Sequence, residues 1–117
     1  MPVIEKVKLQ ELGPKNWGSE ILFAHGPTYI GKVMRMKAGY GGPLQYHVEK
    51  DETFLLLDGE ALVTYADEAG EYHTVHMRAD EAYHVPPGAI HQVQAITECL
   101  FVEASNPVFD DRVAVHR

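Results

Sequence analysis

The sequence predicts an all-β fold, and three observations support this prediction. Short segments in which apolar and polar residues alternate follow one another along the chain, as in strands with one buried face. Turn residues interrupt them at intervals of about 8–12 residues, the spacing of an antiparallel sandwich or barrel. No window of about 12 residues shows a convincing helical stripe, apart from two short candidates, VIEKVKLQEL and FDDRVAVHR.

The first predicted strands lie between residues 30 and 57. Residues 30–37 alternate in polarity and end at the flexible turn AGYGGP. Leu44–Glu49 and Thr53–Leu57 read as two further strands. A tight turn at Lys50-Asp51 would join these two strands as a hairpin.

The second half of the chain continues the pattern through five more strands. Asp58-Gly59 is a two-residue hairpin signal, and DEAGE closes a second hairpin. The turn at Thr97-Glu98 is expected to pair the last two strands. The predicted strands are Glu60–Ala66, Tyr72–Met77, Ala82–Val85 before Pro86-Pro87-Gly88, His91–Ile96 and Leu100–Ala104.

Size and composition set the broad class. The 117 residues fit one domain, 1–117, with one core, and the hydrophobic content of 45% is that of a globular protein. There is no apolar run of about 18 residues, and the N-terminal stretch is too charged for a signal peptide, so no membrane is expected. A formal charge of −7 disfavours nucleic acid as a partner, and the single cysteine, Cys99, favours a reducing cytoplasm.

Four side chains suggest a metal site. Gln45 and His47 face the same side of a strand, about 7 Å apart along the chain. Glu52 follows across the Lys50-Asp51 turn, and His91 begins a distant strand. One amide oxygen, two imidazoles and one carboxylate suit a divalent transition metal such as Zn, Mn, Fe or Ni. Spacing alone also fits ordinary hydrogen-bonded residues on a hairpin.

The surrounding motifs resemble those of the cupin family. Gly39-x5-Gln45-x-His47-x4-Glu52-x6-Gly59 is similar to the first cupin motif, with Gln45 in the place of the first histidine. Residues from Asp80 through Pro86, Gly88 and His91 are similar to the second. Asp80 stands where a glycine is usual, and Ala95 where an asparagine is usual. The resemblance implies a single-domain jelly-roll barrel, a double-stranded β-helix, with its core over about residues 30–105.

The glutamine resembles the mannose-6-phosphate isomerase type II branch of the cupins. That branch implies one metal ion held by Gln45, His47, Glu52 and His91. Shorter similarities lie in Asn16–Glu20, Tyr29–Lys32 and Asp110–Arg112. The implied function is isomerisation of a sugar or sugar phosphate, in which a metal polarises the carbonyl and a base moves the proton.

Candidate residues for that chemistry come from strand parity and charge. Glu49 shares the parity of His47, and His84 precedes the Pro-Pro turn, so both are candidate bases. Arg35 and Lys37 are the candidate substrate-binding residues, because with Lys32 they form the one dense basic group.

Two other function classes stay open, and one partner is expected. The chain could bind a carbohydrate or small metabolite without converting it, or act as a metal-dependent dioxygenase that consumes oxygen and prefers iron. Tyr46, Leu55 and Leu57 point away from the predicted ligand face although they are apolar. This predicts that the N-terminal strand or a second subunit covers the outside of the sheet, and a homodimer is expected.

Overall fold

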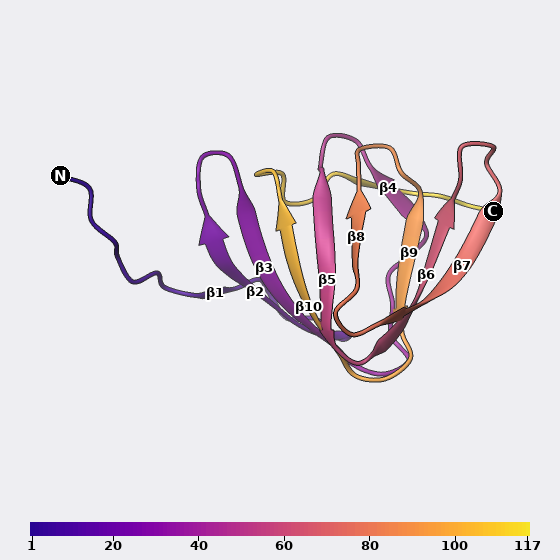
Figure 1. Ribbon diagram of the computed structural model, residues 1–117, viewed down its shortest axis with the longest axis horizontal. Helices are drawn as coiled ribbons and strands as arrows, with labels where there is room; N and C mark the ends of the chain where they lie inside the picture. The colour runs from indigo at the N-terminus through magenta and orange to yellow at the C-terminus, as the bar shows by residue number, and fades with distance from the viewer.

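The computed structural model describes residues 1–117 as a β-sandwich without helices, in which two antiparallel sheets face each other (Figure 1). One sheet has six strands in the order β1-β2-β3-β10-β5-β8, and the other has five in the order β11-β4-β9-β6-β7. The strands are β1 (Gln10–Glu11), β2 (Gly18–His25), β3 (Ile30–Met36), β4 (Gln45–His47), β5 (Glu52–Asp58), β6 (Glu60–Ala66), β7 (Tyr72–Arg78), β8 (Ala82–Val85), β9 (His91–Ala95), β10 (Cys99–Ser105) and β11 (Arg112–Ala114).

The predicted strands are confirmed, but three of the predicted hairpins are wrong. From β3 onward the chain changes sheets at every connection except the one between β6 and β7. The turns at Lys50-Asp51, Asp58-Gly59 and Thr97-Glu98 therefore join strands of opposite sheets. Only DEAGE closes a hairpin, with Glu60 opposite Arg78 and Ala66 opposite Tyr72. The two candidate helical stripes are also wrong, since residues 1–9 are irregular and β11 is a strand.

Gly59 shows why a short turn became a crossing between sheets. Its φ is 103°, and a Cβ there would lie 2.3 Å from the carbonyl oxygen of Glu98. The turn after β5 is thus pressed against the turn before β10, and only glycine fits. Asp80, in the usual glycine place of the second motif, also takes a left-handed conformation, with φ 71°.

The inward-facing side chains change from apolar to polar along the strands. On β5 they run from Leu56 through Phe54 to Glu52, and on β10 from Phe101 to Glu103. The apolar end forms the core, whose buried members are Phe54, Leu56, Ala61, Val63, Met77, Val85, Ala95, Cys99 and Phe101. The polar end is where the sandwich carries its candidate site.

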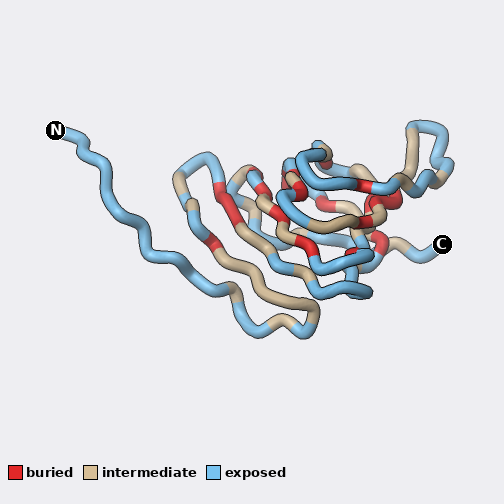
Figure 2. The backbone as a smooth tube through the Cα atoms, turned by 60° about the horizontal axis from the view of Figure 1, so that its bottom comes forward, coloured by how far each residue is buried: buried red, intermediate tan, exposed pale blue.

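Two further features lie outside the core. Residues 1–9 run away from the edge of the six-stranded sheet as an exposed arm (Figures 1 and 2). The structure contains no helix with the length and apolar character needed to cross a membrane.

Candidate metal centre and cavity

Three buried side chains from both sheets converge at the polar end of the sandwich. His47 lies on β4 and His91 on β9 of the five-stranded sheet, and Glu52 begins β5 in the facing sheet. The Glu52 Oε1 atom is 3.4 Å from Nε2 of His47 and 3.6 Å from Nε2 of His91. Each of the three residues is 6% exposed, and their ligand atoms lie within 4.8 Å of one another. The predicted meeting of two remote segments is confirmed.

Both imidazole rings are oriented by a hydrogen bond at the nitrogen that faces away from Glu52. Nδ1 of His91 donates to the carbonyl oxygen of Ala89 at 2.9 Å. Nδ1 of His47 donates to Oδ1 of Asp111 at 3.2 Å. Because both acceptors hold the proton on Nδ1, the two Nε2 atoms carry free lone pairs. Metal-binding histidines are positioned in this way.

Gln45 supplies a fourth donor at the same place. It lies on β4 directly opposite His91 on β9. Its Oε1 atom is buried and has no hydrogen-bond partner. A buried acceptor without a partner is costly, and coordination to a cation would satisfy it. The residues present therefore fit a divalent metal ion.

The electrostatics of the two histidines suit this use. Burial lowers the pKa of His47, and the nearby Lys50 ammonium lowers it further, against the opposing effect of Asp111. Burial is also the main cause that lowers the pKa of His91. Both rings are therefore neutral near pH 7, which is the form that binds a metal.

A buried charge cluster adjoins the three ligands. The Lys50 Nζ atom lies 3.3 Å from Oε2 of Glu52 and 3.2 Å from Oε2 of Glu103. Burial raises the pKa of Glu103 to about 7, and the hydrogen bond with Glu52 and the charge of Glu52 add to this effect. Burial acts to lower the pKa of Lys50, but the two carboxylates outweigh it and raise that pKa. Strand parity with Phe101 was the signal for an inward Glu103, whereas nothing in the sequence indicated Lys50.

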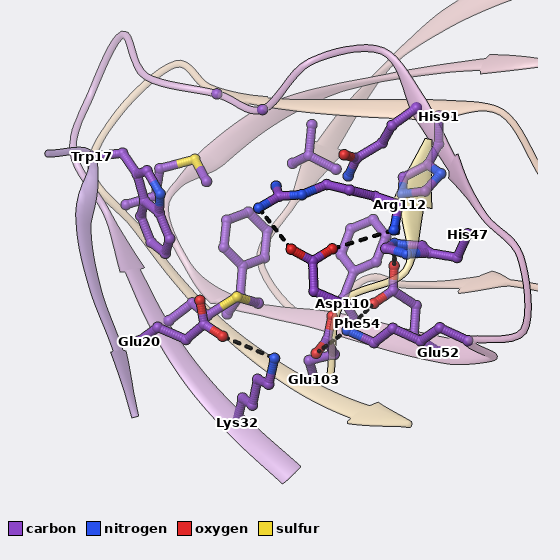
Figure 3. A pocket seen from close by; sticks show the side chains of 18 of the residues that line it. Trp17, Glu20, Lys32, His47, Glu52, Phe54, His91, Glu103, Asp110 and Arg112 are labelled. Atoms are coloured by element: carbon purple, nitrogen blue, oxygen red, sulfur yellow. Dashed lines mark hydrogen bonds and ion pairs between the residues drawn. The ribbon is translucent and has the colours of Figure 1, made fainter. Parts of the chain in front are cut away.

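A cavity of about 300 Å³ extends from this cluster between the sheets. Figure 3 shows His47, Glu52 and His91 on one side of it and Trp17, Glu20 and Lys32 on the other. At the second side, Glu20 accepts from Lys32 at 2.8 Å and faces Lys15 at 3.9 Å. Apolar walls join the two sides, formed by Met34, Met36, Phe54, Val93, Phe101 and Phe109 among others.

The segment after β10 closes one side of this cavity. Phe109 lies under the Lys32 ammonium, 5.6 Å from ring centre to Nζ. Asp110 and Arg112 line the cavity and pair with each other at 3.0 Å.

Asp111, which lies between Asp110 and Arg112, holds the first metal-binding segment. It accepts from the backbone N–H groups of Glu49 and Lys50, in addition to the ring of His47. Desolvation acts to raise the pKa of Asp111, but these hydrogen bonds lower it overall. The segment after β10 is thereby tied to the orientation of a metal ligand.

The other four residues predicted for the site do not line the cavity. Glu49 is exposed, and exposed His84 pairs with Asp51 at 2.7 Å outside the sandwich. Arg35 and Lys37 are exposed, because they have the opposite parity to the inward Lys32. Their roles stay predictions without a contact to the cavity, whereas Lys32 itself is buried within it.

A second group of potential ligands is of a different kind. Asp67, Glu71 and His73 lie at the β6–β7 hairpin, and all three are more exposed than the cluster in the cavity. Their polar atoms already bind one another, with His73 2.7 Å from Asp67. Hydrogen bonds of this kind satisfy a hairpin turn without an ion.

Taken together, the fold and site define a class: small jelly-roll proteins with a histidine and carboxylate cluster inside the barrel. Comparison by sequence gives the family. Residues 32–104 match the cupin domain, so the chain belongs to the cupin family. No curated protein matches the chain by sequence.

Solved structures share this fold at low identity. The capsular polysaccharide assembling protein CapF from Staphylococcus aureus superposes with a TM-score of 0.81 and 20% identity, over 95% of this chain and 32% of CapF. KdgF from Halomonas sp. superposes with a TM-score of 0.74 and 17% sequence identity, over 87% of this chain and 91% of KdgF. Bacillus subtilis oxalate decarboxylase, which is described with Mn(II) centres, superposes with a TM-score of 0.73 and 21% sequence identity, over 87% of this chain and 28% of the enzyme. The chain thus spans about a third of CapF, and these likenesses concern the fold.

Proposed function

We propose that Gln45, His47, Glu52 and His91 hold one divalent metal ion, of the group Zn, Mn, Fe and Ni. The observation that supports this most directly is the buried Gln45 oxygen without a partner, beside two neutral rings with free Nε2 atoms. The Mn(II) centres described for oxalate decarboxylase, a protein of the same fold, are in keeping with it. A mixed nitrogen and oxygen shell suits these metals.

The reaction proposed for this centre is aldose–ketose isomerisation, as in the mannose-6-phosphate isomerase branch. When bound, the metal would supply polarisation of the substrate carbonyl. The chain's own task is to hold the sugar in the cavity and to carry a proton between adjacent carbons. A proton carrier must lie within hydrogen-bond reach of the substrate. Glu103 lines the cavity and Glu49 and His84 do not, so Glu103 is the carboxyl group to test first.

The charges of the cavity favour an unphosphorylated sugar. Every cationic side chain that lines it has a carboxylate partner, and no ammonium or guanidinium group is left over for a phosphate. The partners are Glu20 for Lys15 and Lys32, Glu52 and Glu103 for Lys50, and Asp110 for Arg112. Paired charges offer donors and acceptors to hydroxyl groups without a net field that selects an anion.

The same pairing supports the second candidate, a protein that binds a carbohydrate or small metabolite without converting it. Lys50 and Glu103 hold each other, which also fits a rigid binding surface. The third candidate, a metal-dependent dioxygenase, would use the same metal ligands and require iron and oxygen. Cys99 is free and buried, in keeping with the proposed place in a reducing cytoplasm.

One experiment separates these functions. The metal-free protein is reloaded with one metal at a time and incubated without oxygen in D2O, with aldoses and ketoses in free and phosphorylated forms. We expect NMR to show metal-dependent conversion, with deuterium exchange at the carbon next to the carbonyl. Conversion of phosphorylated sugars alone would contradict the substrate class. Ligand-induced shifts without conversion would support the binding protein. Oxygen uptake by the iron-loaded protein, measured in a parallel incubation in air, would support the dioxygenase.

A matched pair of variants tests the proton carrier. Glu103→Gln should keep its metal and lose most of the conversion, because an amide cannot act as a general acid or base near neutral pH. Glu49→Gln, at an exposed position between β4 and β5, should convert sugars at the parent's rate. If Glu49→Gln lost the conversion and Glu103→Gln kept it, Glu49 would be the proton carrier, as its place on the His47 side of the strand first suggested.

A further inference from the structure

The side of the cavity opposite the metal ligands carries a buried ion pair. The inward side chains of β3 are Ile30, Lys32, Met34 and Met36, so Lys32 is the one charged member of an otherwise apolar row. Its side chain is 6% exposed, and its Nζ atom lies 2.8 Å from Oε1 of Glu20 on β2. A buried ion pair is seldom more stabilising than well-packed apolar side chains of similar size. Stability therefore does not explain this pair, and a role in binding does.

Both members of the pair keep hydrogen-bonding capacity for a ligand. The Lys32 ammonium has three N–H donors and one carboxylate partner. The Glu20 carboxylate offers about four acceptor positions, and its second cation, Lys15, lies at 3.9 Å, beyond hydrogen-bond distance. Glu20 and Lys32 both line the cavity. They can therefore accept from and donate to neighbouring hydroxyl groups while they keep their contact with each other.

Trp17 lies at the same side of the cavity (Figure 3). Its backbone is fixed, since its carbonyl oxygen accepts from the N–H group of Lys37 at 2.8 Å. A Cβ at Gly18 would overlap the carbonyl oxygen of Arg35, so the glycine lets this segment lie directly against β3. The half-buried indole thus offers the cavity a rigid aromatic surface, on which the C–H groups of a ligand can pack.

The far subsite, which consists of Trp17, Glu20 and Lys32, is separated from the metal ligands by several strands. Glu20 lies on β2, and Glu52 lies on β5, three strand positions away. Three spacings of about 4.8 Å place these strands roughly 14 Å apart. Glu103 on β10 lies between them, with Lys32 as its register partner. A ligand bound at both ends passes Glu103, and a three-carbon sugar, with two C–C bonds of about 1.5 Å each, is too short to do so.

From this we infer that the far subsite binds the hydroxyl groups at the end of a sugar that is remote from its carbonyl carbon. The inference rests on the proposed carbohydrate ligand and adds its size, which is six carbons or more. Glu20 and Lys32 hold neighbouring hydroxyl groups, and Trp17 packs against C–H groups of the sugar. The apolar walls contact the C–H groups between the two ends. These residues hold the sugar and take no part in the proton transfer.

Trp17 reports binding directly, because it is the one tryptophan of the chain. The zinc-loaded and the metal-free protein are titrated with the trioses glyceraldehyde and dihydroxyacetone, and with a panel of aldohexoses, ketohexoses and their disaccharides. Sugars of six carbons or more should change the fluorescence of the indole, whereas the trioses should not. A triose response at least as large as that of the hexoses, or no response to any sugar, would overturn the inference.

The ion pair is tested by removing it as a unit. Glu20→Leu/Lys32→Met leaves no buried charge without a partner, so this double variant should fold as the parent does. Calorimetry should find that its Kd for the sugar that binds the parent most tightly is raised about tenfold or more, because hydrogen bonds to two charged groups are lost. Glu60→Gln/His76→Gln removes an exposed pair of the other sheet, 3.6 Å apart, and should bind as the parent does. An unchanged Kd for the first double variant would overturn the role of the pair.

The aromatic surface is tested by two substitutions of Trp17. Trp17→Ala should raise the same Kd about fivefold or more, and Trp17→Phe should recover most of the loss, since it keeps an aromatic face. Binding by Trp17→Ala at the parent's Kd would exclude the indole from the subsite. Metal content is measured on every variant and should equal that of the parent. A protein that binds hexoses at Trp17 without converting them would keep the far subsite and lose the isomerase, so the two failures are distinct.

Discussion

The polar end of the six-stranded sheet carries charged side chains on its inner face and apolar side chains on its outer face. On β10 the inward face includes Glu103, with Lys50 and Glu52 against it, while the outward face carries Leu100 and Val102. Buried charges are costly unless each has a partner, and here each has one. The inner face thus carries paired charges around the candidate metal site, and the outer face carries apolar side chains. Changes on the inner face should break these pairs, whereas changes on the outer face should leave them intact.

The largest effect should come from the inner ligands themselves. His47→Ala and His91→Ala should lower the metal content of the purified protein sharply while the sandwich stays folded. The reason is that each ring supplies a free Nε2 atom to one centre. His73→Ala in the exposed hairpin cluster is the control and should keep the parent's metal content. If elemental analysis found the same metal content in the parent and in both histidine variants, the assignment of these residues as metal ligands would be wrong.

Breaking the inner charge cluster should cost more than any outer change. Lys50→Met leaves Glu52 and Glu103 facing each other without a cation. We expect the free energy of unfolding of the metal-free protein to fall by about 3 kcal/mol or more in urea titrations. Adding Glu103→Gln to this variant should recover part of the loss. A variant as stable as the parent would show that the cluster is solvated.

The stability of the metal-free protein should depend on pH through the ionisation of Glu103. Its pKa is raised from 4.5 to about 7, so the folded state keeps a proton that the unfolded state loses. Stability from this group is therefore full below about pH 4.5 and falls as the pH rises to about 7, by up to about 3 kcal/mol. Glu103→Gln has no such loss.

The difference between the two metal-free proteins measures this effect. The charge of Glu103 also acts to raise the pKa of His47 and of His91, so its removal lowers those two pKa values further. Relative to the parent, the variant should gain stability between pH 4.5 and 7, measured by chemical unfolding at each pH. A constant difference would show that the carboxyl group ionises as it does in water.

The smallest effect should come from Asp111, which does not bind the metal itself but accepts a hydrogen bond from the ring of the metal ligand His47. Asp111→Ala removes the acceptor of the His47 ring and should weaken metal binding about 10–100-fold, measured by competition with a chelator. Asp110→Ala, at an exposed neighbour without a contact to either histidine ring, should bind as the parent does. Equal affinities would mean that the ring needs no support from the segment after β10.

Much of the candidate site was predictable because alternate residues of a strand point to opposite faces, and this alternation can be read from neighbouring residues alone. The alternation alone turned Gln45 and His47 to one face and aligned Glu103 with Phe101. The resemblance to the cupin motifs then linked Glu52 and His91 to them. Glu49, Arg35 and Lys37 do not line the cavity, because they are exposed at the rim or on the outward side of their strands. Their predicted roles stay predictions.

By itself, the sequence determined which segments are strands and which of their faces is apolar, because a period of two is written into neighbouring residues. Tertiary structure alone decided which strands pair, and it placed β4, β6 and β9 opposite β5, β8 and β10. It also brought Lys50 between two carboxylates and Asp111 to His47, 64 residues away. The physical reason is that apolar burial is non-directional, so it selects a face but not a neighbour.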